Sequence, residues 1–419
     1  MKNLFYAQSG GVTSVINASA CGVIEEARKN SKEIGNVLAG HNGIIGAVEE
    51  DLIDTSVLPD SDVRKLRHTP GGAFGSCRYK LPDPNKDMKV YHRLAEVFKA
   101  HNIGYFVYNG GGDSSDTSNK ISTVMKELGV PIVAIGVPKT IDNDLPITDS
   151  CPGFGSVAKY VATSIKEAAL DVYSMSKTST KVFILEVMGR HAGWIAAACA
   201  LAARDGEEGD APHLVLLPEV IFNQEKFLNA VKTIVDKYGF CVIAASEGIK
   251  DQDGKFIAES GLKDSFGHAQ LGGVAPRLAQ MVAVNLQLKY HWAVSDYLQR
   301  AARHIASKSD VEQSYQVGAA AVRMAVAGKN GKMPIIKRLK SKPYEWEIVE
   351  IELSEVANIE AKIPDNFIRD DQMGVTTACR EYLLPLIQGE DYPPYVDGLP
   401  DYFQIKPIFV EKKLPAWEN

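Results

Sequence analysis

Residues 4–30 of the chain, LFYAQSGGVTSVINASACGVIEEARKN, place an apolar run, a pair of glycines and a helical pattern one after another. The apolar run at 4–7 predicts a buried strand, and residues 12–30 predict a helix whose small residues face inward. Between them, the loop around Gly10 and Gly11 allows close approach of its backbone to an anion, and the helix start favours negative charge. A tight strand-to-helix turn without a ligand explains this loop equally well. The whole segment is typical of the first half of a βαβ unit.

The same alternation of short apolar runs, glycine turns and amphipathic segments continues over most of the chain. It indicates βαβ units wound around parallel strands. The expected strands are residues 36–39, 105–108, 132–137, 181–187, 214–217 and 241–246. The expected helices are residues 90–101, 118–128, 155–172, 193–203 and 224–238. We therefore predict an α/β fold with two Rossmann-like domains, each built on a mostly parallel central sheet.

The two sets of elements divide near residues 145–160, where the sequence reads LPITDSCPGFGS. No low-complexity linker separates them, which favours two closely packed domains that share a cleft. We expect a first domain over residues 1–150, to which part of 275–330 returns, and a second domain over residues 151–275. The last part of the chain has the pattern of antiparallel strands and then becomes rich in proline and tyrosine. We expect residues 331–419 to form a small appendage packed on the second domain.

The composition excludes several classes of function. The chain has 419 residues, of which 45% are hydrophobic and 23% charged, as in a globular protein of two or three domains. Its net charge of −6 leaves no cationic surplus for nucleic-acid phosphates. The six cysteines form no CxxC pair, which argues against zinc and a disulfide framework and favours a reducing compartment. Because the N-terminal apolar run is too short for a signal peptide and no run reaches the roughly 18 residues of a membrane span, we expect a cytoplasmic protein.

The run NGGGDSS at residues 109–115 is the clearest candidate for a ligand site. Folding does not require three consecutive glycines at a strand end, so close approach of a ligand is the better explanation. The acid that follows them, Asp113, suits Mg²⁺, which takes one or two carboxylates and shares its other positions with phosphate and water. Asp113 as the cap of the next helix is the structural alternative, and the two roles are compatible.

Two further clusters also follow expected strands. The run PKTIDND at 138–144 places a cation, a hydroxyl and two carboxylates close together. A surface ion pair is the ordinary interpretation of such a run, but its position at the mouth of the same sheet favours a general base and a phosphate ligand. In EVMGRHAG at 186–193, Arg190 has the planar fork that suits a phosphate or sugar phosphate.

Smaller signals are weak on spacing alone. Glu247 ends the expected strand at 241–246, and Arg78 closes the turn-rich run TPGGAFGSCR. Tyr297 and Arg300 are expected one helical turn apart on one face. The chain has neither a P-loop nor a dinucleotide fingerprint after a strand. Glycine loops, an acid for Mg²⁺, a base and basic residues together indicate phosphoryl transfer, in which positioning and charge neutralisation do most of the catalysis.

Taken together, GGDSS at 111–115, PKTIDND at 138–144 and VMGR at 187–190 resemble the phosphofructokinase family in order and spacing, over roughly residues 3–330. PKTIDND is the most specific of the three runs. The resemblance implies two Rossmann-like domains with the active site in the cleft between them. It also implies Mg²⁺-dependent transfer of a phosphoryl group to the 1-hydroxyl of fructose 6-phosphate.

The resemblance assigns a role to each candidate residue. It implies that Asp142 is the base that takes the proton of the sugar hydroxyl, that Lys139 acts beside it, and that Asp113 binds Mg²⁺. The implied donor-binding residues are Gly11, Arg78, Gly112, Ser114 and Ser115. The implied substrate-binding residues are Thr140, Asp144, Lys181, Met188, Gly189, Arg190, Glu247, Tyr297 and Arg300. Lys181 matches a basic position that reaches the site of a neighbouring subunit, so a homodimer or homotetramer is implied.

Two positions bear on the phosphoryl donor. Pyrophosphate-using members of the family have lysine where Lys139 stands, whereas bacterial ATP-using members have glycine. Pyrophosphate-using members usually also carry aspartate where this chain has Ser114, and Leu271 stands where bacterial ATP-using members have an arginine for the sugar phosphate. We expect pyrophosphate as the donor in a reversible reaction. ATP as donor is the nearest alternative, followed by a non-catalytic regulatory subunit and a dinucleotide-dependent oxidoreductase.

Overall fold

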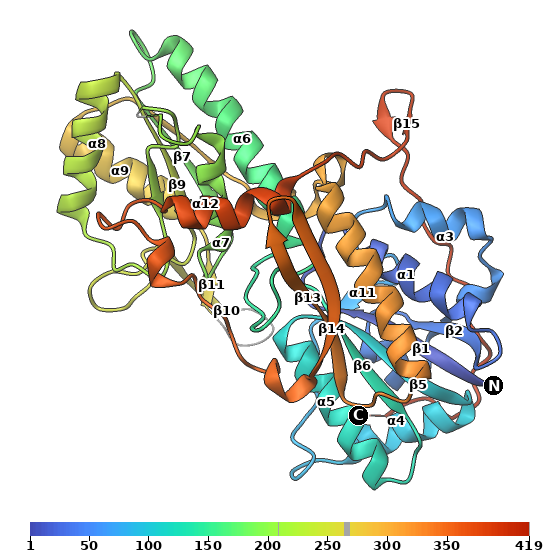
Figure 1. The fold of residues 1–419 in the computed structure, drawn as a ribbon. Coiled ribbons are helices and arrows are strands. Elements are labelled where there is room, and N and C mark those ends of the chain that lie inside the picture. Colours follow the sequence, from blue (N-terminus) through green and yellow to red (C-terminus); the bar gives the residue numbers. More distant parts are fainter. Residues whose placement is uncertain (208, 264–268, 419) are drawn as a thin grey trace.

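The computed structural model describes residues 1–207, 209–263 and 269–418, whose main elements are two separate sheets flanked by helices (Figure 1). The larger sheet has the strand order β14-β13-β6-β5-β1-β2-β3, with β4 paired to β1. Its strands are β1 (Lys2–Ser9), β2 (Ile34–Gly40), β3 (Leu52–Asp54), β4 (Ser76–Cys77), β5 (Ile103–Gly110), β6 (Val133–Pro138), β13 (Lys332–Ser341) and β14 (Tyr344–Glu352). The second sheet, in the order β12-β7-β9-β8, is fully parallel and consists of β7 (Val182–Val187), β8 (Leu214–Leu216), β9 (Cys241–Ser246) and β12 (Tyr290–Val294).

The helices divide between the two sheets. Those on the first sheet are α1 (Ile16–Lys29), α2 (Ile44–Val48), α3 (Asp60–Leu66), α4 (Lys89–Ala100), α5 (Gly112–Glu127) and α11 (Lys308–Val326). Those on the second are α6 (Phe154–Met175), α7 (Trp194–Cys199), α8 (Gln224–Tyr238), α9 (Val274–Leu286), α10 (Asp296–Ala301) and α12 (Thr377–Leu383). Two short antiparallel pairs complete the fold, β10 (Glu259–Lys263) with β11 (Ala269–Leu271), and β15 (Tyr395–Val396) with β16 (Leu399–Pro400).

The expected fold class is confirmed. Central strands such as β5 and β9 are apolar along nearly their whole length because helices cover both faces of a parallel sheet. The expected strands coincide with observed ones, whereas α5 begins at Gly112, earlier than the expected residue 118. The edge strand β12 was not predicted, since its side chains are only half-buried or exposed and its sequence is not a continuous apolar run.

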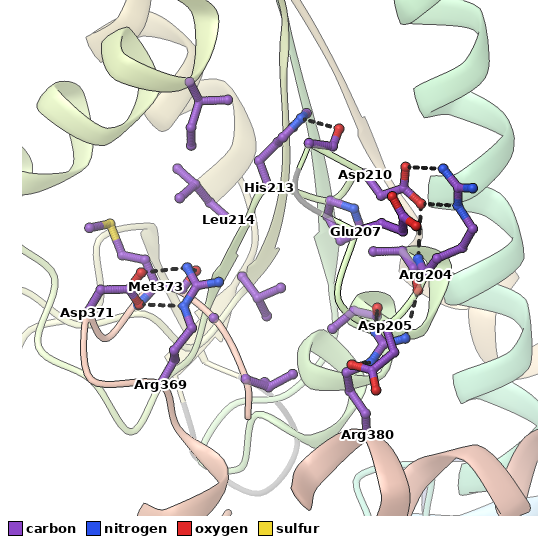
Figure 2. Close-up of a pocket in the computed structure, with 18 of the residues that line it drawn as sticks. Arg204, Asp205, Glu207, Asp210, His213, Leu214, Arg369, Asp371, Met373 and Arg380 are labelled. Atoms are coloured by element: carbon purple, nitrogen blue, oxygen red, sulfur yellow. Dashed lines mark hydrogen bonds and ion pairs between the residues drawn. The ribbon is translucent and has the colours of Figure 1, made fainter. Parts of the chain in front are cut away.

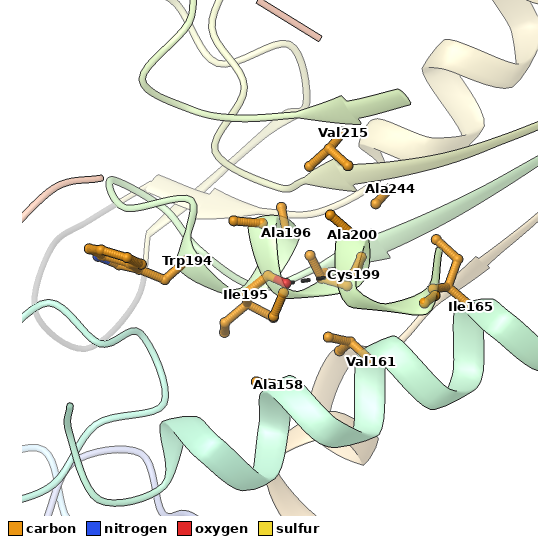
Figure 3. Packing of buried hydrophobic residues seen from close by; sticks show 14 of the residues in the cluster. Ala158, Val161, Ile165, Trp194, Ile195, Ala196, Cys199, Ala200, Val215 and Ala244 are labelled. Carbon is orange, nitrogen blue, oxygen red and sulfur yellow. Dashed lines mark hydrogen bonds between the residues drawn. The ribbon is translucent and has the colours of Figure 1, made fainter. Parts of the chain in front are cut away.

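The core of the second domain is assembled from small side chains. In Figure 3, Ala158, Val161 and Ile165 on α6 face Ile195 and Cys199 on α7, all of them buried. Alanine and cysteine at these positions let the helices approach the sheet closely, so the apolar run at 192–203 is a buried core helix. None of the helices in the described ranges is long and apolar enough to cross a membrane.

The chain returns to the first domain through α11, which packs against α1. The contact depends on two glycines, because a Cβ on Gly318 would lie 2.1 Å from the backbone oxygen of Ser19 and one on Gly22 would lie 2.2 Å from that of Tyr315. A side chain at either position would push the helices apart. Residues 308–326 therefore lie on the first domain.

The C-terminal region differs from the expected appendage on the second domain. The antiparallel strands are present as the β13–β14 hairpin, but they extend the first sheet, where Lys332 is in register with Ile135 of β6. The part of the C-terminal region that packs on the second domain includes Ile363 and Leu386, which are buried in its core, and α12, which lies against α7. The tail then returns to the first domain, where Phe409 bridges to Ile53. The alternating pattern of residues 332–352 predicts strands, but it carries no information about which sheet edge they join.

Candidate functional site

The carboxyl ends of β1, β5, β6, β7 and β9 point toward one cavity of about 340 Å³, lined by residues of both domains. Ligands bind at this end of the strands in open parallel sheets, because loops and helix starts gather there. The candidate residues that line this cavity are Gly11, Arg78, Gly112, Asp113, Ser114, Lys139, Thr140, Asp142, Asp144, Met188, Arg190, Glu247, Tyr297 and Arg300. Fourteen residues predicted from separate motifs therefore meet in one place.

A second cavity of about 500 Å³ opens on the far part of the second domain (Figure 2). Its arginines are bound by neighbouring groups: Arg204 donates to Asp210 (2.7 and 3.0 Å), and Arg369 donates to Asp371 (2.9 Å at Nε). Arg380 donates to the carbonyls of Ala200 and Ala203, which follow α7, and its Nε lies 3.6 Å from Asp205 Oδ1. Because its cations are already neutralised, this cavity is less suited to a phosphate than the one between the domains.

One side of the cleft is formed by the loops after β1 and β5, which carry residues expected to bind the donor. We call the loop around Gly10 and Gly11 the donor loop. Gly10 lies in the left-handed region (φ +73°), where its N–H donates to Cys77 O at 2.9 Å and its carbonyl accepts from Ser76 Oγ at 2.8 Å. At Gly11, a Cβ would lie 2.9 Å from Nη1 of Arg300. The bare backbone of this loop therefore leaves room for an arginine beside it, as an anion site requires.

Lys139 is the cation nearest to the donor loop. Its side chain is buried, and Nζ donates a hydrogen bond to the carbonyl of Gly11 at 2.6 Å. Burial lowers the pKa of Lys139 to about 8, against the opposing effect of Asp142 and with a contribution from Arg300. The ammonium thus lies in a site of reduced dielectric, where its charge acts more strongly than in water.

Two carboxylates follow Lys139 on the same loop. Burial raises the pKa of Asp142 and of Asp144 above the ordinary aspartate range, and nearby carboxylates raise them further. Asp142 N–H donates to Thr140 Oγ1 at 3.1 Å, which fixes the turn between them. A carboxylate with a raised pKa at a cavity wall is suited to accept a proton near neutral pH.

The second domain contributes the loop after β7. Gly189 has φ +132°, a conformation that favours glycine, and its N–H donates to Glu247 Oε1 at 3.4 Å. Its carbonyl accepts a hydrogen bond from Ser246 Oγ. A Cβ on Gly248 would lie 2.1 Å from the backbone oxygen of Arg190, so these two loops are in direct contact. Burial raises the pKa of Glu247 to about 7.

Tyr297 and Arg300 lie on one face of α10, as the spacing predicted. The guanidinium of Arg300 sits 3.7 Å above the ring of Tyr297. Its Nη1 reaches toward Gly11, so the arginine extends from the second domain to the donor loop.

Three predicted residues do not line the cavity. Ser115 is buried, with Oγ donating to Gly111 O at 3.0 Å. Gly189 lies behind Met188 and Arg190, and acts through its turn. Lys181 precedes β7 at the end of the strand opposite to the cavity, where Nζ donates to the carbonyl of Ser176. Leu271, the last residue of β11, is also absent from the cavity wall.

Several cavity residues were not predicted. His191 is not among the candidates named from the sequence, yet it lines the cavity beside Glu360, a residue from the C-terminal region. Tyr79 follows Arg78 directly, and its neighbour Lys80 reaches Asp113. The position of His191 directly after Arg190 is a signal that could have been used. Glu360 lies in no motif, so only the fold places it in the cleft.

The residues present fit a magnesium ion that is shared with a phosphate. Asp113 is half-exposed in the first turn of α5, and its Oδ1 is paired with Lys80 Nζ at 3.1 Å. In the described ranges no group of three or more His, Cys, Asp or Glu side chains is arranged to hold a metal by itself. One accessible carboxylate beside an anion-binding loop matches the preference of Mg²⁺ for few protein ligands.

Asn17 holds the donor loops together from beneath. Its buried side-chain amide donates to the carbonyls of Thr69 and Gly71, both at 2.8 Å. Its oxygen accepts from the N–H of Ala73 and from Gln8 Nε2, both at 3.0 Å. All four hydrogen-bonding positions of one amide are therefore used to connect the end of β1 with the loop that leads to Arg78.

Replacing Asn17 with leucine should weaken binding on the donor side. The change leaves buried carbonyls and an N–H without hydrogen-bond partners, which destabilises this arrangement of the loops by about 1–3 kcal/mol. We therefore expect the affinity for inorganic pyrophosphate, measured by isothermal titration calorimetry, to fall about tenfold. The exposed Asn229→Leu on α8 is the matched control. Unchanged affinity in an Asn17→Leu protein with a native circular dichroism spectrum would show that the amide does not position these loops.

Comparison with known proteins agrees with this geometry. The model of the family described as phosphofructokinase matches residues 3–325. A pyrophosphate–fructose 6-phosphate 1-phosphotransferase from Halomonas elongata is 60% identical over 416 residues, covering 99% of each chain, and one from Methylococcus capsulatus is 59% identical over 415 residues, covering 99% of this chain and 98% of that one. The crystal structure of a pyrophosphate-dependent phosphofructokinase from Nitrosospira multiformis is 59% identical, covers 100% of both chains and has a TM-score of 0.93.

Proposed function

Since the chain belongs to the phosphofructokinase family, we propose that it transfers a phosphoryl group from pyrophosphate to the 1-hydroxyl of fructose 6-phosphate. The products are fructose 1,6-bisphosphate and phosphate, and the reaction is reversible. The observation that carries this proposal is Lys139, a buried ammonium that bonds the donor loop and precedes the proposed base Asp142 by three residues. The names of the relatives at 60% and 59% identity support the same donor and acceptor.

Asp142 is the general base of the proposed reaction. Its carboxylate takes the proton of the 1-hydroxyl as that oxygen forms a bond to the nearer phosphorus of pyrophosphate. The bond from this phosphorus to the bridging oxygen breaks, and the bridging oxygen leaves with the second phosphoryl group. Thr140 and Asp144 hold the loop and the sugar around this centre.

Lys139 neutralises the charge of the departing phosphate. Phosphoryl transfer needs positioning and charge stabilisation more than covalent chemistry. The ammonium beside Gly11 lies where the donor loop would hold pyrophosphate, and Arg78 and the backbone of Gly112 would add to that binding. Asp113 would hold Mg²⁺, which, when bound, neutralises and orients the phosphate oxygens.

The second domain binds the sugar phosphate in this proposal. Glu247 accepts hydrogen bonds from sugar hydroxyls, Met188 forms the wall beside it, and the turn at Gly189 positions that wall. The guanidinium of Arg190 pairs with a phosphate, and Tyr297 with Arg300 completes the same end of the site. Because Arg300 extends to Gly11, its guanidinium would also contact the bound donor.

The choice of donor can be tested directly. We expect wild-type protein to form fructose 1,6-bisphosphate with pyrophosphate at a higher kcat/KM than with ATP in a coupled spectrophotometric assay. Lys139→Met should lower the pyrophosphate-dependent kcat by about 10²-fold, as for loss of one transition-state contact. A higher kcat/KM with ATP would show that the protein is an ATP-dependent enzyme. This is the second candidate function, because Ser114 stands where pyrophosphate-using members usually have an aspartate. No turnover with either donor would favour a regulatory subunit.

Asp142→Asn tests the base. The amide is nearly isosteric, so we expect kcat to fall by about 10²–10⁴-fold with little change in the KM of the sugar. In wild type, the base must be ionised, and the pKa of Asp142 is raised to about 6, so kcat/KM should rise with pH through that value. A variant that keeps a third of the wild-type kcat would exclude Asp142 as the base.

We also propose that the enzyme is a homo-oligomer in which Lys181 reaches the neighbouring subunit's site. Lys181 lies just before β7, the strand beside the edge strand β12, and its N–H donates to Lys289 O next to β12. This edge strand exposes Trp292 at 45%, and Leu298 beyond it is 66% exposed, as at an interface. We expect sedimentation to give a dimer or tetramer for wild type and monomers for Trp292→Lys. A monomeric and fully active wild type would contradict the proposal.

A cytoplasmic location is the last part of the proposal. All six cysteines are buried and none is in a disulfide, which suits a reducing compartment. Recovery of the activity outside the soluble cytoplasmic fraction of cells would contradict this location.

A further inference from the structure

The segment between β14 and α12 crosses from the first domain to the second beside the cleft. It starts on the first sheet, where Leu353 packs so closely that a Cβ on Gly136 would lie 2.7 Å from its side chain. Near Asn358 the segment passes the loop after β5. The backbone nitrogen of Asn358 lies 3.8 Å from the position that a Cβ on Gly112 would take. It ends at Ile363, buried in the core of the second domain. We call residues 353–363 the crossing segment.

Backbone groups hold the crossing segment in place. The N–H of Ala361 donates to the carbonyl of Asp144 at 2.6 Å. The N–H of Ile363 donates to Glu219 Oε1 at 3.2 Å, and the same oxygen accepts the N–H of Gly193 at 2.9 Å. Any residue at 360 would allow these bonds, so the fold of the segment does not require a charge at that position.

Glu360 nevertheless places a carboxylate in the cavity wall. Its Oε2 lies 2.9 Å and its Oε1 3.3 Å from Nδ1 of His191, which directly follows Arg190. The ring of His191 stacks on that of Phe256, with centroids 6.5 Å apart and planes at 19°. The carboxylate and the aromatic ring thus hold the imidazole from two sides, and with it the turn that carries Arg190.

The negative charge of Glu360 also acts on the proposed base. It raises the pKa of Asp142 after burial and Glu247, and it raises that of Asp144 after burial and Asp142. Glu360 is half-exposed, yet its charge still disfavours the ionised forms of the two buried aspartates, because like charges repel. The fold of the segment does not need the charge of Glu360, and Asp142 and Asp144 repel it. A role in the site explains why a carboxylate nevertheless stands at this position.

We propose that Glu360 is a positioning residue of the active site, supplied by the crossing segment beyond the part of the chain that matches the family model. Its carboxylate orients His191 and so holds the loop of Arg190 against the sugar phosphate. The same charge adds to the negative field at Asp142, on which Lys139, Arg190, Asp144 and Glu247 also act. This inference rests on the proposed function, because it concerns the sugar side of that same site.

Glu360→Gln tests the proposal with an isosteric, neutral side chain. The His191 pair is partly exposed, and such pairs are worth up to about fivefold in an equilibrium constant. We therefore expect the KM for fructose 6-phosphate to rise about three- to fivefold, with the KM for pyrophosphate unchanged. The acid limb of the kcat/KM profile should move to lower pH by on the order of half a unit, because a like charge has been removed from the base.

A second variant separates the two effects. His191→Asn breaks the pair but keeps the carboxylate, so the KM of the sugar should rise without a shift of the acid limb to lower pH. In the double variant the KM should rise no further than in the single ones, since both changes remove one interaction. Glu347→Gln, which removes an exposed ion pair with Lys337 on β14, is the matched control and should leave both quantities unchanged.

An unchanged sugar KM and an unchanged profile in a Glu360→Gln protein of wild-type melting temperature would overturn the proposal. A raised KM without a shifted acid limb would also overturn it, because a purely structural role gives that result. Failure of the proposed function is a different outcome, since wild type would then lack pyrophosphate-dependent turnover altogether.

Discussion

The geometry of the cleft depends on residues 139–153, the link between β6 and α6. This link contains both the buried Lys139 and the proposed base Asp142, and it leads from the first domain to the second. It contains no helix and only the single bridge between Thr140 and Gly153, so most of its backbone groups must find other partners. Asp310 on α11 accepts the N–H of Gly153, at the end of the link, and that of Ser156, in the first turn of α6, at 2.9 Å each. These bonds fix the start of α6 to a helix of the first domain. The position of Asp142 relative to the second domain follows from where α6 begins.

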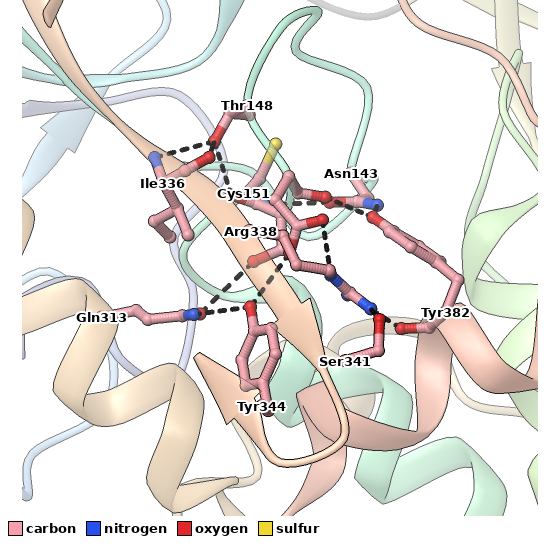
Figure 4. A network of polar contacts seen from close by, with 11 residues as sticks. Asn143, Thr148, Cys151, Gln313, Ile336, Arg338, Ser341, Tyr344 and Tyr382 are labelled. Atoms are coloured by element: carbon pink, nitrogen blue, oxygen red, sulfur yellow. Dashed lines mark hydrogen bonds and ion pairs between the residues drawn. The ribbon is translucent and has the colours of Figure 1, made fainter. Parts of the chain in front are cut away.

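The middle of the link is held by the C-terminal elements (Figure 4). Asp149 is central: Arg338 of β13 donates to its Oδ1 at 2.8 Å, and Tyr344 of β14 donates to its Oδ2 at 2.9 Å. Tyr382 of α12 donates to the carbonyl of Asp149 and accepts from Asn143 Nδ2 at 3.0 Å. Asn143 lies within PKTIDND itself, so the network ends next to the base. A half-satisfied buried network would be costly, and here the hairpin and α12 supply the partners.

Local sequence patterns predicted the strands and the loops that follow them, because these features are determined locally. An apolar run followed by glycines predicts a strand end, and parallel strand ends meet at one edge of a sheet, so the loops that carry Gly11, Asp113 and Asp142 were predicted to lie together without knowledge of the sheet order. Arg78, Tyr297 and Arg300 were weak signals on spacing alone, and only the family resemblance assigned them to the site. Interactions between distant segments were not predictable in this way. The strands of the hairpin could have joined either sheet, Asn17 is an unremarkable residue in a helix pattern, and Glu360 lies in no motif. Each of these depends on which surfaces meet in three dimensions, and periodicity carries no signal for that.

The same reasoning gives the C-terminal region a role in the geometry of the site. Beyond the hairpin and α12, the tail returns to the first domain, where the buried carboxylate of Glu50 accepts the N–H groups of Lys413 (2.6 Å) and Leu414 (3.1 Å) and pairs with His101. A buried carboxylate is tolerated only with such partners. The tail therefore supplies hydrogen bonds that the buried Glu50 of the first domain needs, and these bonds in turn hold the tail on that domain. Residues beyond the family match therefore hold the link, wall the cleft and complete the core. A chain that ended with the matched region would keep the base and the lysine, but it would need other groups to hold them at the distance the reaction requires.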